Sequence, residues 1–128
     1  MHKDLVIEVD NEPGALARVA AAVSDAGVNL AAATCFGNGQ RAEMHILVPH
    51  PEATKHALAL SNLAVTRERD VVVVDVHDEP GILADLACKV AKAGVSLDLV
   101  YVATNNRVVF GSHDTAALAA ALGVAAGN

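Results

Sequence analysis

Asn11-Glu12-Pro13-Gly14-Ala15-Leu16 returns later in the chain as Asp78-Glu79-Pro80-Gly81-Ile82-Leu83. The same distance of 67 positions separates Ala26-Gly27-Val28-Asn29-Leu30 from Ala93-Gly94-Val95-Ser96-Leu97. Two matches at one offset indicate that a single supersecondary unit has been duplicated. We therefore expect two domains, residues 1–69 and residues 70–128.

Each copy is predicted to begin with a strand and a helix. Residues 5–9 and 71–76 are rich in β-branched side chains, which suit a half-buried sheet. In the segment that follows, apolar residues recur with helical spacing. Proline at the first helical position and glycine just past the last turn mark the helix ends in both copies: Pro13 and Gly27, then Pro80 and Gly94.

A β-hairpin is predicted after each helix. In the first copy, strands over residues 28–36 and 42–48 flank the turn Gly37-Asn38-Gly39. In the second copy, strands over residues 96–103 and 107–111 flank Asn105-Asn106. The spacing Gly37-x-Gly39-x-x-Ala42 also matches a dinucleotide fingerprint, but that fingerprint must open a helix, so we interpret it as a hairpin turn.

The last elements differ between the copies. Second helices are predicted near Pro51 and Asp114, the latter a good N-cap, and residues 63–69 form a last strand in the first copy. The counterpart of this strand would begin near position 125, so we expect it to be mostly missing. Either the edge of the second sheet stays open, or another segment or chain completes it.

This order of elements predicts an α+β fold. It consists of two tandem βαββαβ units of the ferredoxin-like type, in which two helices cover one face of an antiparallel sheet. The second unit lacks most of its last strand.

Composition limits the functions available to this chain. Its 128 residues are 53% hydrophobic and 19% charged, which is typical of a folded globular protein. A net charge of -6 and only 2% aromatic residues argue against nucleic acid as a partner. Neither a secretory signal nor an apolar run of membrane-spanning length is apparent, so we expect a cytoplasmic protein without a membrane partner.

Catalytic and metal-binding patterns are also missing from the sequence. The serines lack the G-x-S-x-G elbow of a nucleophile, and His45 and His50 do not have the spacing of a metal site. Cys35 and Cys88 form no C-x-x-C pair, and we expect both to be small buried hydrophobes. No cofactor and no metal are predicted.

The repeated pattern resembles the ACT domain. In each copy a strand leads to Asn or Asp, any residue, Pro and Gly, then to a helix that ends at Gly-Val-Asn or Gly-Val-Ser. The chain is therefore similar to a tandem ACT-domain protein. The resemblance implies a regulatory module that binds a free amino acid, or a similar metabolite, at the seam between two paired units.

By position, the resemblance implies two sets of ligand contacts. In the first copy they are Asn11, Pro13, Gly14, Ala15 and Leu16, with Asn29 facing them from the partner unit; in the second they are Asp78, Pro80, Gly81, Ile82, Leu83 and Ser96. His77 lies in the second loop and is a further candidate. Where serine-binding relatives carry histidine, this chain has Val9 and Val76. We expect the two sites to be inequivalent.

Elementary chemistry supports the same loops independently. Helix N-termini expose unpaired backbone N–H groups, so amides near Ala15 and Leu16 can hold an α-carboxylate. An amide such as Asn11 can donate or accept, whereas ionised Asp78 only accepts, so the second site favours an amino group. Ordinary helix starts would also explain Pro, Gly and the caps Asn11 and Asp78. Asn29 and Ser96 are harder to explain without a ligand.

The leading hypothesis is a non-enzymatic amino-acid sensor, expected to form a homodimer and to serve an enzyme of amino-acid metabolism. The first alternative is a ligand-free interaction module that regulates an enzyme in trans. The second is a small metal-dependent enzyme.

Overall fold

The computed structural model describes residues 2–124 and divides the chain into two compact units, with the boundary between Arg69 and Asp70. The two are described separately. Each is an antiparallel sheet with two helices on one face, so the predicted α+β class is confirmed.

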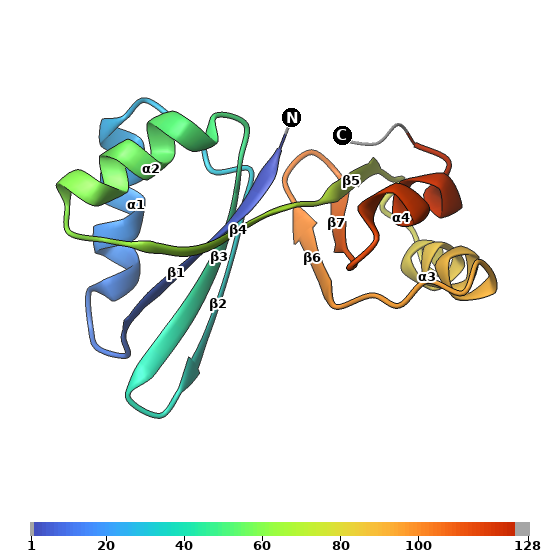
Figure 1. Ribbon diagram of the computed structural model, residues 1–128, viewed down its shortest axis with the longest axis horizontal. Coiled ribbons are helices and arrows are strands. Elements are labelled where there is room, and N and C mark those ends of the chain that lie inside the picture. The colour runs from blue at the N-terminus through green and yellow to red at the C-terminus, as the bar shows by residue number, and fades with distance from the viewer. Residues whose placement is uncertain (1, 125–128) are drawn as a thin grey trace. The chain divides into compact units, whose positions relative to one another are not determined.

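The first unit has the complete βαββαβ order. Its elements are β1 (Lys3–Asp10), α1 (Ala15–Asp25), β2 (Ala32–Asn38), β3 (Arg41–Val48), α2 (Pro51–Leu60) and β4 (Val65–Asp70). The strands lie in the order β2-β3-β1-β4, and α1 and α2 cover one side of them (Figure 1). Because side chains alternate along a strand, Leu5, Ile7 and Val9 of β1 face the helices and join the core with Val19 and Leu58.

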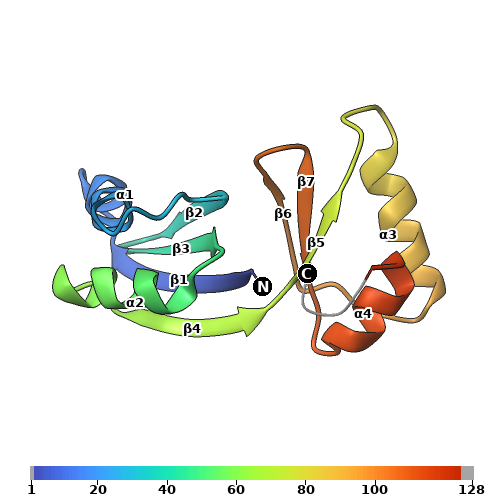
Figure 2. The ribbon, with the colours of Figure 1, turned by 90° about the horizontal axis from the view of Figure 1, so that it is seen from above.

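The second unit repeats this order as far as its second helix. Its elements are β5 (Val72–Asp75), α3 (Ile82–Lys92), β6 (Leu99–Ala103), β7 (Arg107–Gly111) and α4 (Thr115–Leu122). The strand order is β5-β7-β6, with α3 and α4 on one side (Figure 2). Phe110 and Leu118 are fully buried in its core. The predicted loss of the last strand concerns positions from about 125 onward, which lie outside the described residues.

The predicted second strand of each unit begins too early. β2 begins at Ala32 rather than at residue 28, and β6 at Leu99 rather than at residue 96. The cause lies at the helix ends, where Gly27 and Gly94 have φ of 72° and 74°. The next residue folds back onto the helix in a Schellman motif: its N–H donates to Val23 O at 3.3 Å in the first unit and to Val90 O at 3.2 Å in the second.

Both hairpins are confirmed, with one shift. In the second unit Ala103 pairs with Arg107, so the turn consists of Thr104, Asn105 and Asn106, and the last two have positive φ of 61° and 54°. In the first unit β2 extends to Asn38, so the turn is Gly39-Gln40 rather than Gly37-Asn38-Gly39. Strands lie on both sides of this turn, which agrees with its interpretation as a hairpin and not as a dinucleotide loop.

The expectation that both cysteines are buried is wrong. Cys35 and Cys88 are exposed free thiols. Cys35 lies on β2, which is an edge strand of its sheet. An edge strand has a neighbouring strand on one side only, so its side chains are less covered. Cys88 lies on α3, where Leu86 and Val90 are the buried positions.

Candidate functional site

The repeated Pro-Gly segments are type II turns that lead into α1 and α3. Gly14 has φ 88° and ψ -6°, and Gly81 has φ 91° and ψ -8°. The turns are closed by Ala15 N–H donating to Glu12 O at 3.3 Å and by Ile82 N–H donating to Glu79 O at 3.4 Å. Proline at the second turn position and glycine at the third are the residues that this turn favours.

This geometry corrects the predicted helix starts. Pro13 and Pro80 precede the helices and are not their first residues. The reason is the left-handed conformation of the following glycine, which lies outside the helical region, so each helix begins only after Gly14 or Gly81.

Asn11 and Asp78 do not cap their helices. The N-cap positions are Gly14 and Gly81, and neither helix start has a side-chain cap. The Asn11 amide instead donates from Nδ2 to Gly39 O at 3.0 Å, and its backbone N–H donates to Gln40 O at 2.8 Å. Asn11 therefore fastens the turn to the β2–β3 hairpin.

Gly37 belongs to the same contact. A Cβ atom at position 37 would lie 2.6 Å from Asn11 Nδ2, a distance that real side chains do not adopt. Glycine at this position lets the Asn11 side chain lie flat against β2. The second unit has no such contact within the described residues.

Two backbone donors remain open at each turn. Arg18 N–H donates to Gly14 O at 3.0 Å and Asp85 N–H to Gly81 O at 2.9 Å, which closes the first helical turn. Within residues 2–124, no acceptor is recorded for the N–H groups of the two intervening residues, Leu16 and Ala17 or Leu83 and Ala84. Such a pair, at the positive end of a helix, suits an anion such as a carboxylate.

The structure brings together only part of each predicted set. Asn11, Pro13, Gly14, Ala15 and Leu16 form one corner, and His77, Asp78, Pro80, Gly81, Ile82 and Leu83 form the other. Ala15 is buried, whereas Leu16 is 53% and Leu83 is 46% exposed.

Asn29 and Ser96 lie away from these corners. Both are exposed and follow the far end of α1 or α3. Because α1 has 11 residues, its two ends are about 16 Å apart. Figure 1 shows the β1–α1 and α1–β2 connections at opposite ends of the helix. A ligand held at the Gly14 turn therefore cannot reach Asn29 of the same unit.

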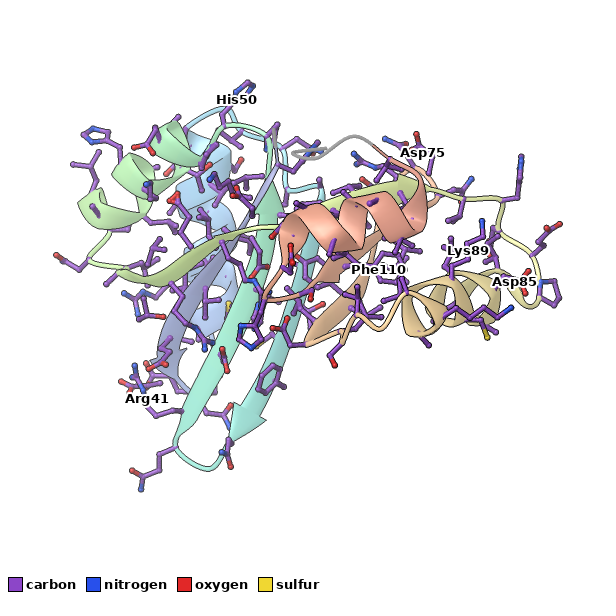
Figure 3. All side chains as sticks on the ribbon, turned by 45° about the vertical axis from the view of Figure 1, so that its right-hand side comes forward. Arg41, His50, Asp75, Asp85, Lys89 and Phe110 are labelled. Atoms are coloured by element: carbon purple, nitrogen blue, oxygen red, sulfur yellow. The ribbon has the colours of Figure 1, made fainter. Side chains whose placement is uncertain are left out.

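One charge difference at these turns was missed from the sequence. Arg18 lies in the first turn of α1, and its counterpart at the offset of 67 is Asp85, in the first turn of α3 (Figure 3). An alignment of the two copies carried through the helix would have revealed it. The first helical turn of α1 therefore carries a cation where that of α3 carries an anion.

The described residues lack two kinds of functional feature. Among them, no group of three His, Cys, Asp or Glu residues could hold a metal ion. No helix in that part of the chain has the length and apolar character needed to cross a membrane.

The first unit matches a known protein family. Residues 3–63 match the model of the ACT domain. The match includes the Asn-Glu-Pro-Gly turn on which the sequence resemblance rests. That the chain is a tandem of two ACT domains remains a prediction. No curated protein matches the chain.

Solved structures resemble the chain over both units. Protein BT0572 from Bacteroides thetaiotaomicron is similar with a TM-score of 0.84 and 27% identity, over 94% of this chain and 85% of that one. The regulatory subunit of aspartate kinase from Thermus thermophilus, in its ligand-free form, gives 0.67 and 21%, over 94% and 89%. The aspartokinase alpha and beta subunits give 0.66 and 15%, over 96% and 93%. The two kinase likenesses establish a shared fold.

Proposed function

We propose that this protein is a non-catalytic regulatory module that binds a free amino acid, or a similar small metabolite, through paired ACT units. The observation that carries the proposal is the type II turn, which occurs twice and leaves two backbone donors open at the start of α1 and of α3. The ACT match over residues 3–63 supports the same function. We further propose that residues 70–128 form a second ACT domain.

A ligand with both a carboxylate and an ammonium group fits the first turn best. The open N–H groups of Leu16 and Ala17 would hold the carboxylate, and Arg18 adds favourable charge. The ammonium group needs an oxygen acceptor, and the exposed Asn29 amide of the partner subunit would supply one. This assignment gives Asn29 a function that its own unit does not provide.

Sheet topology explains how a second copy would deliver that amide. β1 and β2 both run antiparallel to β3, so they are parallel, and the Gly14 turn lies at the end of the sheet where β2 finishes. Asn29 precedes β2 and lies at the other end. If β2 of one copy pairs antiparallel with β2 of another, Asn29 of the partner subunit approaches the Gly14 turn. We propose a homodimer built on this pairing.

The same reasoning applies to the second unit, where β6 ends the sheet and Ser96 precedes it. Exposed apolar side chains support an interface there. Val102 is 72% and Val100 is 43% exposed on β6, and both lie on the same sheet face as Val108 and Phe110 of the core. Clusters of exposed apolar side chains often mark contacts with another protein.

The regulated target is proposed to be an enzyme of amino-acid metabolism. This part rests on the likeness to the regulatory subunit of aspartate kinase from Thermus thermophilus, which provides a fold and a precedent. The same exposed edge also supports the second candidate, a module that contacts an enzyme without a ligand. The two candidates differ in whether a small molecule stabilises the purified protein.

The experiment is a thermal-shift screen of the full chain against each common amino acid at millimolar concentration, followed by calorimetry. A ligand that binds only the folded state raises the melting temperature. We expect a response that Asn29→Ala weakens more than Asn11→Ala, because Asn11 acts through the hairpin. Lys92→Ala, a charge change on the last turn of α3, is the control for nonspecific effects. No response to any compound would favour the ligand-free candidate.

A further inference from the structure

The sheet of the first unit has one face that points away from its helices. Side chains on this face form cross-strand rows, in which Val6 of β1, His45 of β3 and Thr34 of β2 lie directly opposite one another. His45 and Asp4 are both buried, with Asp4 fully so. A buried imidazole next to a buried carboxylate requires a defined set of hydrogen bonds.

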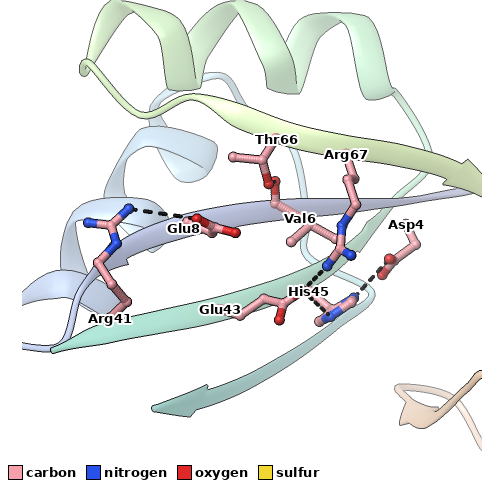
Figure 4. Close-up of polar contacts among 8 residues, drawn as sticks. All are labelled: Asp4, Val6, Glu8, Arg41, Glu43, His45, Thr66 and Arg67. Carbon is pink, nitrogen blue, oxygen red and sulfur yellow. Dashed lines mark hydrogen bonds and ion pairs between the residues drawn. The ribbon is translucent and has the colours of Figure 1, made fainter. Parts of the chain in front are cut away.

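Both ring nitrogens of His45 face carboxylate oxygens (Figure 4). Nδ1 lies 2.9 Å from Asp4 Oδ2, and Nε2 lies 3.3 Å from Glu43 Oε1. A neutral imidazole has one N–H donor and one acceptor, whereas an imidazolium has two donors. Only the protonated ring can donate to both carboxylates, because in either neutral tautomer one nitrogen lone pair faces a carboxylate oxygen.

The cluster extends to a third strand. Arg67 of β4 contacts the same Glu43 oxygen that faces His45, and it reaches that oxygen across Val6 of β1 (Figure 4). Thr66 of β4 donates from Oγ1 to Val6 O at 3.2 Å. Asp4, His45, Glu43 and Arg67 therefore link β1, β3 and β4. β4 is the strand that leads into the second unit.

The surrounding groups favour the charged ring. The hydrogen bond to Asp4 is the largest cause that raises the pKa of His45 above 6.5, the negative charges of Asp4 and Glu43 add to it, and burial and Arg67 oppose it. The residue that faces His45 from β2 is Thr34, and Phe36 stacks on the ring with 6.1 Å between centroids; neither side chain carries a charge.

We propose that protonated His45 is a pH-dependent clamp that holds β1, β3 and β4 of the first unit together and is released when the ring loses its proton. Upon release, Glu43 faces a nitrogen lone pair instead of a donor, and the repulsion between them moves the Glu43 carboxylate away from the ring and out of the position where Arg67 also contacts it. The backbone amide hydrogens of β4 then exchange with water more readily. This proposal is independent of whether the Pro-Gly turns bind a ligand.

The sign of the pH dependence follows from linkage. A group whose pKa is raised in the folded state adds stability that is complete below its unfolded value and is lost as the pH rises through its folded value. The clamp therefore contributes fully below pH 6.5, the ordinary value for histidine, and weakens in alkaline solution.

Nuclear magnetic resonance of the full chain tests the clamp. We expect the His45 ring to titrate above 6.5, with both nitrogens protonated at that pH. We also expect the hydrogen-exchange protection of residues 66–69, corrected for intrinsic rates, to fall several-fold from about pH 6 to about pH 9. A His45 midpoint at or below 6.5 would overturn the proposal.

Two substitutions separate the clamp from a general pH effect. In His45→Gln the protection of β4 should lose its pH dependence, whereas His56→Gln, at an exposed position on α2, should retain it. Equal pH profiles in wild type and His45→Gln would contradict the proposal. If His45→Gln does not fold, Glu43→Gln provides the test: it removes one negative charge from Nε2 and should lower the His45 midpoint, and an unchanged midpoint would refute the clamp.

Discussion

The Gly14 and Gly81 turns have the same backbone but opposite surroundings. Their glycine dihedral angles agree within a few degrees, and both leave two N–H donors open at a helix start. Both turns contain a glutamate. The first helical turn after Gly14 carries Arg18, and Asn11 before it bonds the hairpin. The matching positions around Gly81 are Asp85 and Asp78. Duplication preserved the shape of the turn and changed the charge that a ligand would meet.

The contrast shows that the backbone shape of the turn and the charge near it are set by different residues. The Glu-Pro-Gly residues determine the turn, because proline and glycine fit its backbone angles. The charge near each turn differs at positions outside the motif, four residues further along each helix, where Arg18 and Asp85 lie. We therefore expect the first corner to suit a carboxylate better than the second, and the inequivalence of the two sites stays a prediction.

The largest expected effect tests whether the two turns have the same backbone conformation. Gly14→Ala and Gly81→Ala should each lower the free energy of unfolding by about 1–2 kcal/mol, because alanine is strained at positive φ. No atom lies within 4 Å of an added Cβ at either position, so the cost is conformational and similar at both turns. Urea unfolding of each variant measures it.

A matched pair checks the cause of that effect. Asparagine tolerates the left-handed region better than alanine, so Gly14→Asn and Gly81→Asn should be milder than the alanine variants. A large cost at one turn and none at the other would contradict the equivalence of their backbones.

The next effect tests the hairpin contact that distinguishes the first turn. Asn11→Ala removes the bond to Gly39 O and should cost about 0.5–1.5 kcal/mol of stability. Asp78→Ala is the matched change in the second unit and should be close to neutral, because no side-chain cap forms there. Thermal unfolding of both variants gives the comparison. Equal losses would mean that Asn11 does not anchor the hairpin.

The smallest effect tests the charge difference itself. Arg18→Ala should weaken binding of the amino acid found in the screen a few-fold, the size expected for about 0.3–1 kcal/mol from a charge near a helix N-terminus. Asp85→Ala should raise affinity at the second turn by a similar factor. Calorimetry in low and high salt measures both changes, and the differences should shrink as salt increases. Identical affinities in all variants would exclude a role for these charges.

Much of the fold was predictable from short stretches of sequence. The Pro-Gly turns, the glycines at 27 and 94 and the Asn105-Asn106 turn act through local backbone preferences, and the structure confirms their places. The errors were also local. The second strands begin three or four residues late because the residue after each C-terminal glycine is still bonded to the helix. Apolar residues after a helix do not reveal that bond.

The side-chain partners were less predictable. For Asn11 the sequence suggested either a ligand contact or a helix cap, and its amide instead bonds Gly39, which is 28 residues away. His45 was considered only as a metal ligand and rejected, and its partner Asp4 is 41 positions distant. Strand register decides both contacts, and no pattern within a single segment records it.

By itself, the sequence determined that one unit occurs twice, that each copy runs strand, helix, hairpin and helix, and where the two Pro-Gly turns fall. Those properties depend on the conformations that a few neighbouring residues prefer. Tertiary structure alone decided which polar groups meet: Asn11 with the hairpin, His45 with two carboxylates, and Asn29 remote from its own turn. Such pairings are long-range, because each exists only once strands far apart in the chain have aligned.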